Sequence, residues 1–380
     1  MTAQIRQVVT TADWDAFFTA ADVCQGHDPM WIAPMRFMQR DQLNPKKNPW
    51  FQHGEAALFV AEQNGRPVGR ISAQIDRSHL ALRNDNTGFF GFFECIDDQA
   101  VADALFATAA AWLRARGMSR CLGPFSLNVN EESGLLIDGF NCPPRMGMGH
   151  AQPYYSALVE KAGFARSVDM YAYLTPQDTG LPFKQLKWLK RVLERDKRLG
   201  VRCLDPKHFD RDLAIVLKIW RAAWAENWGS IPITDAEMKH TASELKFIII
   251  PELVTFATVD GDPVAMCVAL PDLNEMIRGL NGRLLPFNWA KLGWRFLNRA
   301  TYCSGTRVPL MGVMPEYKNK TMGSILALLT VGAVRDASLK LRLPVCEMSW
   351  VLESNTQTRH SIEDIGGRVY KTYRMYDRAI

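Results

Sequence analysis

The sequence predicts a mixed α/β fold made of two consecutive units that share one order of elements. The chain has 380 residues, which exceeds the size of most single hydrophobic cores and favours two domains. Each half contains two extended apolar runs around a tight turn, at Asn64-Gly65 and at Asp260-Gly261, and such turns indicate β-hairpins. In each half a strand, a long helix, a strand, a shorter helix and a last strand follow, so the order repeats.

The expected first domain covers residues 1–175. Its first helix, at 10–23, begins with Thr10, a residue type preferred as a helix cap, and carries acidic residues in its first turn. The other expected elements are strands at 5–9, 87–97, 119–125 and 165–174, a hairpin at 55–76, and helices at 98–117 and 153–164. The Pro, Gly and Asp content of residues 176–182 is typical of a linker.

The expected second domain covers residues 183–380. Its elements are helices at 183–200, 208–229, 324–341 and 355–367, a hairpin at 251–272, and strands at 201–205, 308–315, 344–353 and 368–377. The segment 278–300 is inserted between the hairpin and the next strand. As a helix from residue 288 it places Trp289, Leu292 and Phe296 on one face and Lys291, Arg295 and Arg299 on another. This pattern is typical of a membrane-surface contact through 288–299, of a lid over an acyl chain, or of an ordinary helix packed on a sheet.

Composition excludes several classes of protein. The net charge is only +5 and no block of five like charges occurs, so a dedicated nucleic-acid binder is not expected. The eight cysteines are scattered singly, without the spacing of a zinc site, so we expect no metal and a reducing, cytoplasmic environment. The first residues lack the apolar core of a signal peptide, and no run of about 18 uncharged apolar residues is present. We therefore expect a cytoplasmic protein, or one bound peripherally to the inner face of the cytoplasmic membrane.

A strand, a polar loop and a helix start meet in VMPEYKNKTMGS, residues 313–324. Val313, Pro315, Tyr317, Lys318 and Gly323 match in register the loop motif of the GNAT superfamily of acyl-CoA-dependent N-acyltransferases, and the chain resembles a tandem of that fold. Lys318 replaces the usual Gln or Arg, and Thr321 replaces the first glycine. The alternative interpretation is a solvated loop that leads into a core helix.

This resemblance implies an acyl-CoA site whose loop N–H groups and helix start hold a pyrophosphate, with Lys318 and Lys320 adding positive charge. The implied cofactor-binding residues are Gly312, Val313, Lys318, Asn319, Lys320, Thr321, Met322, Gly323, Ser324 and, on the following helix, Asn355. In the first half, Asp97 and Asp98 stand where a pyrophosphate would be repelled, so one cofactor site is expected. A tyrosine that protonates the thiolate in this superfamily is replaced by Ile362, which leaves that role vacant or moved.

A narrower resemblance rests on motifs along the whole chain, among them FFGFFE at 89–94, LPDLNE at 270–275 and EMSWVLESN at 347–355. These are similar to a bacterial tandem GNAT family that includes the bacterial ceramide synthases. The resemblance implies transfer of a long-chain fatty acyl group from acyl-CoA to the amine of a sphingoid base, sphinganine or 3-ketosphinganine. Three alternatives stay open: a short-chain acetyltransferase acting on a small amine, an aminoacyl transferase of the peptidoglycan type, and a non-catalytic acyl-CoA or lipid-binding protein.

Acyl transfer to an amine needs a base for the ammonium proton. Glu347 is the first candidate, because it stands inside the apolar strand PVCEMSW and desolvation makes a carboxylate a stronger base. Glu353, on the same strand face by a period of two, is the second. His360 is the third, since imidazole titrates near neutral pH. The alternatives are carboxylates held by a backbone amide or an arginine, and a surface histidine.

The polar run NVNEES follows a strand of the first half, where substrate loops lie in the superfamily. Asn128, Asn130 and Glu131 are therefore candidate ligands for an amino-alcohol headgroup. A turn built from asparagine side chains explains the same residues equally well.

Overall fold

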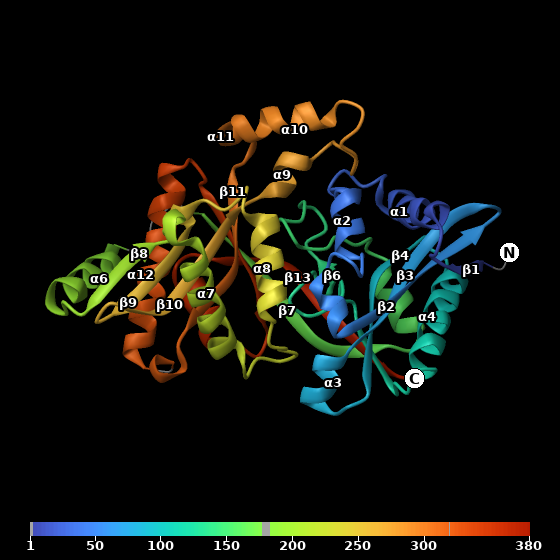
Figure 1. Ribbon diagram of the computed structural model, residues 1–380, viewed down its shortest axis with the longest axis horizontal. Coiled ribbons are helices and arrows are strands. Elements are labelled where there is room, and N and C mark those ends of the chain that lie inside the picture. The colour runs from blue at the N-terminus through green and yellow to red at the C-terminus, as the bar shows by residue number, and fades with distance from the viewer. Residues whose placement is uncertain (1–2, 177–182, 319) are drawn as a thin grey trace. The chain divides into compact units, whose positions relative to one another are not determined.

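The computed structural model describes residues 3–176, 183–318 and 320–380 (Figure 1). The expected linker at 176–182 lies outside these residues apart from Pro176, and so does Asn319. The chain forms two compact units. Unit 1 comprises residues 1–171, 277–289 and 371–380, and unit 2 comprises residues 172–276 and 290–370. Two segments from the second half of the chain therefore belong to the unit built mainly by the first half.

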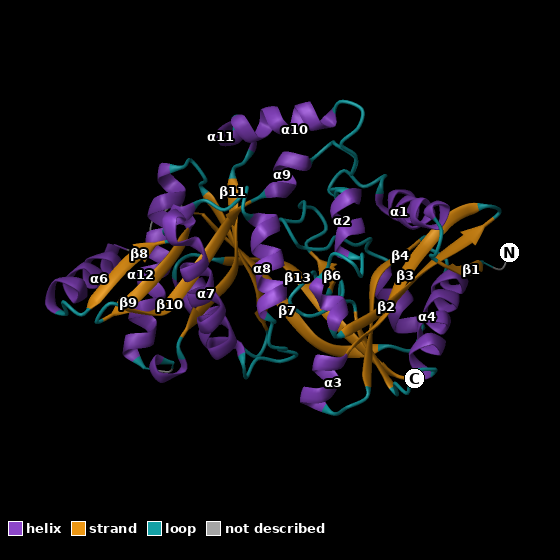
Figure 2. Ribbon diagram, viewed as in Figure 1, coloured by secondary structure: helices purple, strands orange, loops and turns teal. Residues whose placement is uncertain are grey.

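Unit 1 is a sheet with helices on it (Figure 2). Its elements are β1 (Gln4–Gln7), α1 (Thr11–Gln25), α2 (Arg36–Gln42), β2 (Gly54–Gln63), β3 (Arg66–Asp76), α3 (Arg77–Arg83), β4 (Thr87–Cys95), α4 (Gln99–Arg114), β5 (Arg120–Gly123), β6 (Leu135–Asp138), α5 (Tyr155–Lys161) and β7 (Ala165–Pro176). The strands run in the order β1-β2-β3-β4-β5, and β5 pairs with the end of β13 (Arg368–Ala379). The predicted hairpin is present as β2 and β3, with positive φ at Asn64 and Gly65.

Unit 2 repeats this plan. Its elements are α6 (Phe183–Arg195), β8 (Leu199–Cys203), α7 (Phe209–Trp224), α8 (Asp235–Leu245), β9 (Val254–Val259), β10 (Asp262–Pro271), α9 (Leu273–Ile277), α10 (Asn288–Leu297), α11 (Arg299–Tyr302), β11 (Gly305–Val313), α12 (Thr321–Lys340), β12 (Val345–Leu352) and α13 (Thr356–Asp364). The strands follow the order β8-β9-β10-β11-β12, and β11 pairs with β12 in parallel. The end of β7, from Ala172 on, also belongs to unit 2 and follows β12 in the sheet. Because α10 ends at Leu297, the predicted single helix that includes Arg299 is wrong, and Arg299 begins α11.

Two helices cover opposite faces of the unit 2 sheet. Phe256 and Met266 pack with α7, whereas their neighbours Ala257 and Ala265 pack with α12, as the alternation of side chains along a strand requires. By length and composition α12 is apolar enough to cross a membrane, with a mean hydropathy of 1.4. Its Leu326 and Leu329 lie in the core of the unit.

Candidate functional site

The parallel strands β11 and β12 separate part of the way along their length. Their ladder runs from Gly305 opposite Val345 to Val308 opposite Met348. Beyond that point β11 continues to Val313 and stays paired with β10 up to Ala265, while β12 continues to Leu352. After Val308, the backbone of β11 on the side of β12 therefore has no strand partner in this ladder. Its N–H and C=O groups on that side require other hydrogen-bond partners.

The chain enters α12 directly from this opening, through a 3-10 turn at Pro315–Tyr317. The N-cap residue of α12, Lys320, makes no side-chain capping bond, so its side chain leaves the first N–H groups of the helix without the usual cap among the described residues. Gly323 is sterically required, because a Cβ there would lie 2.4 Å from the carbonyl oxygen of Tyr317. The exposed Lys318 lies 3.8 Å from the Glu226 carboxylate, a surface pair of little strength.

The predicted cofactor residues fall into two groups in the structure. The described ones between Gly312 and Ser324, which exclude Asn319, form the end of β11, the turn and the first turn of α12. Gly312 contacts α7, where a Cβ would lie 3.0 Å from the Cβ of Ala223. Asn355 is instead the N-cap of α13, and its Oδ1 accepts the N–H of Thr358 at 3.2 Å. The strand end, basic turn and uncapped helix start can together receive an extended ligand that ends in a phosphate.

Glu347 is completely buried on β12, one residue before the last pair of the ladder. Ser349 donates a hydrogen bond to its Oε1, and the hydroxyl of Tyr370 donates one to its Oε2. Arg307, its neighbour on β11, places Nε 3.8 Å from Oε1 and donates to the Ser349 hydroxyl at 3.1 Å. The carboxylate is therefore buried with compensation from three polar side chains.

The contacts of Glu347 are compatible with both interpretations of this residue, a structural carboxylate and a general base. The contact with Arg307 is the one that a structural carboxylate would make, and the guanidinium also lies 4.8 Å from the ring centre of Trp350. The hydroxyl of Tyr370 gives the same carboxylate a proton-carrying neighbour. Sequence reasoning missed Arg307, Ser349 and Tyr370. The signals were an arginine within the apolar strand TRVPLMGV and a tyrosine in the alternating strand RVYKTY.

The other two candidate bases lie elsewhere on unit 2. The prediction that Glu353 shares a strand face with Glu347 is wrong, because β12 ends at Leu352. The carbonyl of Glu353 accepts a bond from Arg359 at 3.1 Å. The His360 side chain is exposed on α13. Ile362 is buried against Gly367, so the position at which the resemblance implies a tyrosine belongs to the core here.

Asn128, Asn130 and Glu131 form a turn in unit 1. The Oδ1 of Asn128 accepts the N–H of Asn130 at 2.8 Å, and its carbonyl accepts the N–H of Glu131 at 3.2 Å. Gln42 donates to the Glu131 carboxylate at 3.3 Å. These contacts agree with the turn interpretation, and a role in binding substrate stays a prediction.

In unit 1, helix α4 begins with a side-chain cap, unlike helix α12 of unit 2. Asp98 is the N-cap of α4, and its Oδ1 accepts the N–H of Ala100 at 2.9 Å. A carboxylate of the chain thus occupies the helix start that corresponds to the uncapped start of α12. That the first half holds no pyrophosphate site stays a prediction.

Unit 1 also buries a carboxyl group that sequence reasoning missed. Glu94 on β4 accepts hydrogen bonds from Tyr155 at 2.7 Å and from Gln25 at 2.8 Å, and Arg70 lies 3.7 Å away. Burial raises the pKa of Glu94 to about 7, against the opposing effect of Arg70. Glu94 was not recognised as a buried carboxyl group because it follows the phenylalanines of FFGFFE in an apolar strand.

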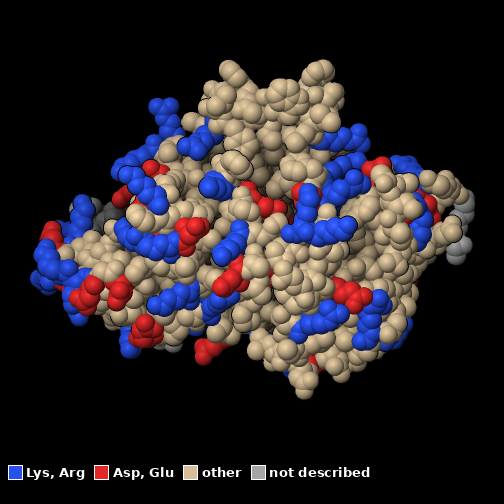
Figure 3. All heavy atoms as spheres, in the orientation of Figure 1, with Lys and Arg blue, Asp and Glu red and all other residues tan. Residues whose placement is uncertain are grey.

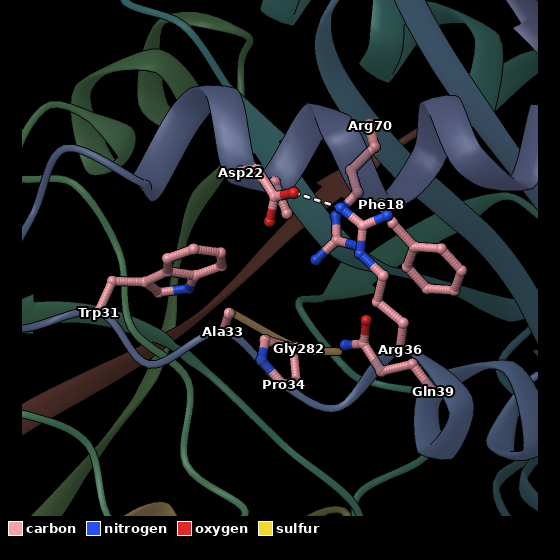
Figure 4. Close-up of a pocket in the computed structure, with 10 residues that line it drawn as sticks. Phe18, Asp22, Trp31, Ala33, Pro34, Arg36, Gln39, Arg70 and Gly282 are labelled. Atoms are coloured by element: carbon pink, nitrogen blue, oxygen red, sulfur yellow. Dashed lines mark hydrogen bonds and ion pairs between the residues drawn. The ribbon is translucent and has the colours of Figure 1, made fainter. Parts of the chain in front are cut away.

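A small hollow lies beside Arg70 in unit 1 (Figure 4). It is lined by Phe18, Trp31 and Gly282 among others, and an ion pair between Arg36 and Asp22 spans it. Among the described residues, no group of three or more His, Cys, Asp or Glu side chains is arranged to hold a metal ion.

Comparisons with known proteins add to this geometry. No protein-family model matches the chain. The tandem GNAT protein from the clavulanic acid biosynthesis pathway superposes with a TM-score of 0.55 at 10% identity, over 99% of this chain and 98% of that one. The bacterial ceramide synthase of Caulobacter vibrioides is 40% identical over 374 residues, 98% of this chain and 96% of the relative. Protein YghO of Escherichia coli K12 is 39% identical over 377 residues, 99% of this chain and 95% of the relative.

The fold is therefore that of a tandem GNAT protein, which confirms the predicted fold class. The level of identity over nearly the whole chain goes further than the fold. The chain belongs to the family of N-acyltransferases that includes the bacterial ceramide synthase of Caulobacter vibrioides.

Proposed function

We propose that this protein transfers a long-chain fatty acyl group from acyl-CoA to the amine of a sphingoid base, sphinganine or 3-ketosphinganine. The observation that carries the proposal is the 40% identity to a bacterial ceramide synthase over 98% of the chain. The buried Glu347 network beside the opening between β11 and β12 supplies a place for the chemistry.

In this proposal acyl-CoA binds along the end of β11 and the start of α12. The first-turn N–H groups of α12, together with Lys318 and Lys320, hold the pyrophosphate, because an uncapped helix start favours an anion. Backbone groups of Gly312 and Val313 receive the thioester end, where an N–H would stabilise the oxyanion of the tetrahedral intermediate. No metal takes part.

Glu347 and Tyr370 divide the proton transfers. The amine attacks the thioester carbon, and its ammonium proton passes to Glu347. When the C–S bond breaks, the leaving thiolate takes the proton of the Tyr370 hydroxyl. The phenolate then recovers a proton from Glu347 through the hydrogen bond that joins the two side chains. One proton has moved from amine to thiol, and both residues return to their starting states. Tyr370 thereby takes the role left vacant at Ile362.

The acceptor is proposed to bind through the turn at Asn128–Glu131, and the enzyme to work in the cytoplasm at the inner face of the membrane, where a long-chain amine resides. Incubating the purified protein with palmitoyl-CoA or acetyl-CoA and a panel of amines, read by mass spectrometry, tests the proposal. N-acylation of sphinganine or 3-ketosphinganine by palmitoyl-CoA is the expected result. Consumption of acetyl-CoA alone, aminoacylation of a peptide amine, or binding without turnover on any amine would each reject it.

A further inference from the structure

Helix α10 exposes an apolar face. Trp289, Trp294 and Leu297 are 60%, 61% and 85% exposed, and α10 contains no buried residue. The loop before it adds Leu285 and Phe287, at 76% and 78%. In a folded protein in water, aromatic and aliphatic side chains that are mostly exposed and close together mark a surface that awaits a partner.

The exposed residues share one side of the helix. Trp289, Gly293 and Leu297 are spaced by four, as are Ala290 and Trp294, so together they form one continuous apolar side. A Cβ on Gly293 would meet nothing within 4 Å, which shows that this side is open. Leu292 and Phe296, by contrast, are only partly exposed. The apolar face that points to solvent is thus distinct from the face that packs.

The chain segment that carries this surface has charges of one sign. Between Met276 and Tyr302 the sequence has five basic residues and no acidic one. Arg283, Lys291 and Arg299 are exposed, whereas Arg295 is held by the carbonyl of Met276 at 2.5 Å. In Figure 3 the atoms over α10 and the loop before it are mostly uncharged, and Lys and Arg side chains gather nearby.

From this combination we propose that residues 285–297 insert into the headgroup region of a bilayer that contains anionic phospholipid. Tryptophan favours the membrane interface, leucine and phenylalanine enter the acyl-chain boundary, and flanking basic residues attract anionic headgroups. A second protein copy would bury the same apolar area but gains nothing from charged residues that are all basic within the segment, which favours the bilayer as the partner. The inference deepens the proposed function by naming the surface through which a lipid acceptor is reached, but it requires no acyl transfer.

The test is co-sedimentation of the full chain with phosphatidylcholine vesicles, with and without phosphatidylglycerol, in the absence of acyl-CoA and amine. The apolar variant carries Trp294→Ser and Leu297→Ser, which leaves the bond from the Trp289 indole to the Pro286 carbonyl intact. The charge variant carries Lys291→Gln and Arg299→Gln. The matched control is Phe247→Ser, since Phe247 is 87% exposed but lies outside this surface.

We expect the wild type and the Phe247 control to bind phosphatidylglycerol vesicles, more weakly as salt rises. The apolar variant should partition at least about tenfold less, as expected when two interfacial side chains are lost. The charge variant should lose its preference for phosphatidylglycerol. The proposal is overturned if the wild type stays in the supernatant, if the apolar variant binds as well as the control, or if the substitutions only dissociate an oligomer. Because no substrate is present, none of these outcomes depends on the proposed chemistry.

Discussion

The hydroxyl of Tyr370 donates a hydrogen bond to the buried carboxylate of Glu347. Glu347 lies on β12 one residue before the last pair of its ladder with β11, and Tyr370 lies near the start of β13. A proton carrier and a proton acceptor are thus in direct contact beside the opening. This pair is the basis of the first two predictions.

Replacing Glu347 with Gln should lower kcat by about 10²- to 10⁴-fold, the usual contribution of a positioned general base. Affinity for acyl-CoA should be unchanged, because the amide retains the shape and one acceptor oxygen. The measurement is steady-state turnover alongside CoA binding. Glu353→Gln is the control and should turn over normally. Turnover equal to wild type in Glu347→Gln would remove it from the mechanism and leave a structural carboxylate bonded to Arg307.

Replacing Tyr370 with Phe removes one hydroxyl and keeps the ring. We expect kcat to fall by more than about tenfold, with KM little changed, because the thiolate loses its proton donor. The control is Tyr173→Phe, which also removes a bonded, partly buried hydroxyl, one that donates to Glu363 at 3.0 Å. If both variants lose the same activity and the same thermal stability, the Tyr370 hydroxyl has only a structural role.

Lys318→Ala combined with Lys320→Ala should weaken CoA binding about tenfold and reduce its dependence on salt, because two exposed charges near the pyrophosphate are lost. Lys340→Ala, at the opposite end of α12, is the matched control. Calorimetric titration with CoA measures both. If the double variant binds CoA as tightly as the wild type, residues 313–324 are a solvated loop before a core helix and not a pyrophosphate site.

Gly323→Ala should impair CoA binding without a change of charge. The new Cβ would lie 2.4 Å from the carbonyl oxygen of Tyr317, so the turn before α12 must shift. Gly293→Ala, also in a helix, meets open space and should bind CoA like the wild type. Titration with CoA, with a melting curve for each variant, separates a local shift from unfolding. Equal affinity in both variants would show that the turn does not set the site.

The buried carboxyl group of Glu94 should make the free energy of unfolding depend on pH, and this effect is independent of catalysis. Burial raises its folded pKa to about 7, above its unfolded value, so the folded state binds the proton more tightly. Stability from this group is present below pH about 4.5 and is lost as the pH rises to about 7. Denaturation of the wild type and of Glu94→Gln across this range measures it. The slope should disappear in the variant, and a slope that persists would assign it to other groups.

Local features of the site could be predicted from the sequence, because they depend on neighbours along the chain. A lone carboxylate in an apolar strand identified Glu347 as buried, and the polar run before an apolar helix located the start of α12. The partners of Glu347 could not be predicted, since Arg307 reaches it through strand register and Tyr370 from another strand. Glu353 was misplaced because strand alternation does not show where a strand ends.

The exposed face of α10 is a second feature that could not be predicted from the sequence. The helical period placed Trp289 with Leu292 and Phe296, but it does not say which side of a helix faces solvent. In the structure the more exposed side carries Trp289, Trp294 and Leu297. Burial is a property of the whole fold, so an apolar helix face that remains outside is visible only once the fold is known.

With the proposed acyl-CoA site, the two helix starts described above predict how many CoA molecules the chain holds. In unit 1 the Asp98 carboxylate caps the start of α4, whereas the side chain of Lys320 makes no capping bond at the start of α12. A duplicated fold would otherwise suggest two equivalents of CoA per polypeptide. Because Asp98 caps α4 in unit 1, we expect one CoA per chain in a saturated sample. The binding curve should be a simple hyperbola, without cooperativity within the chain.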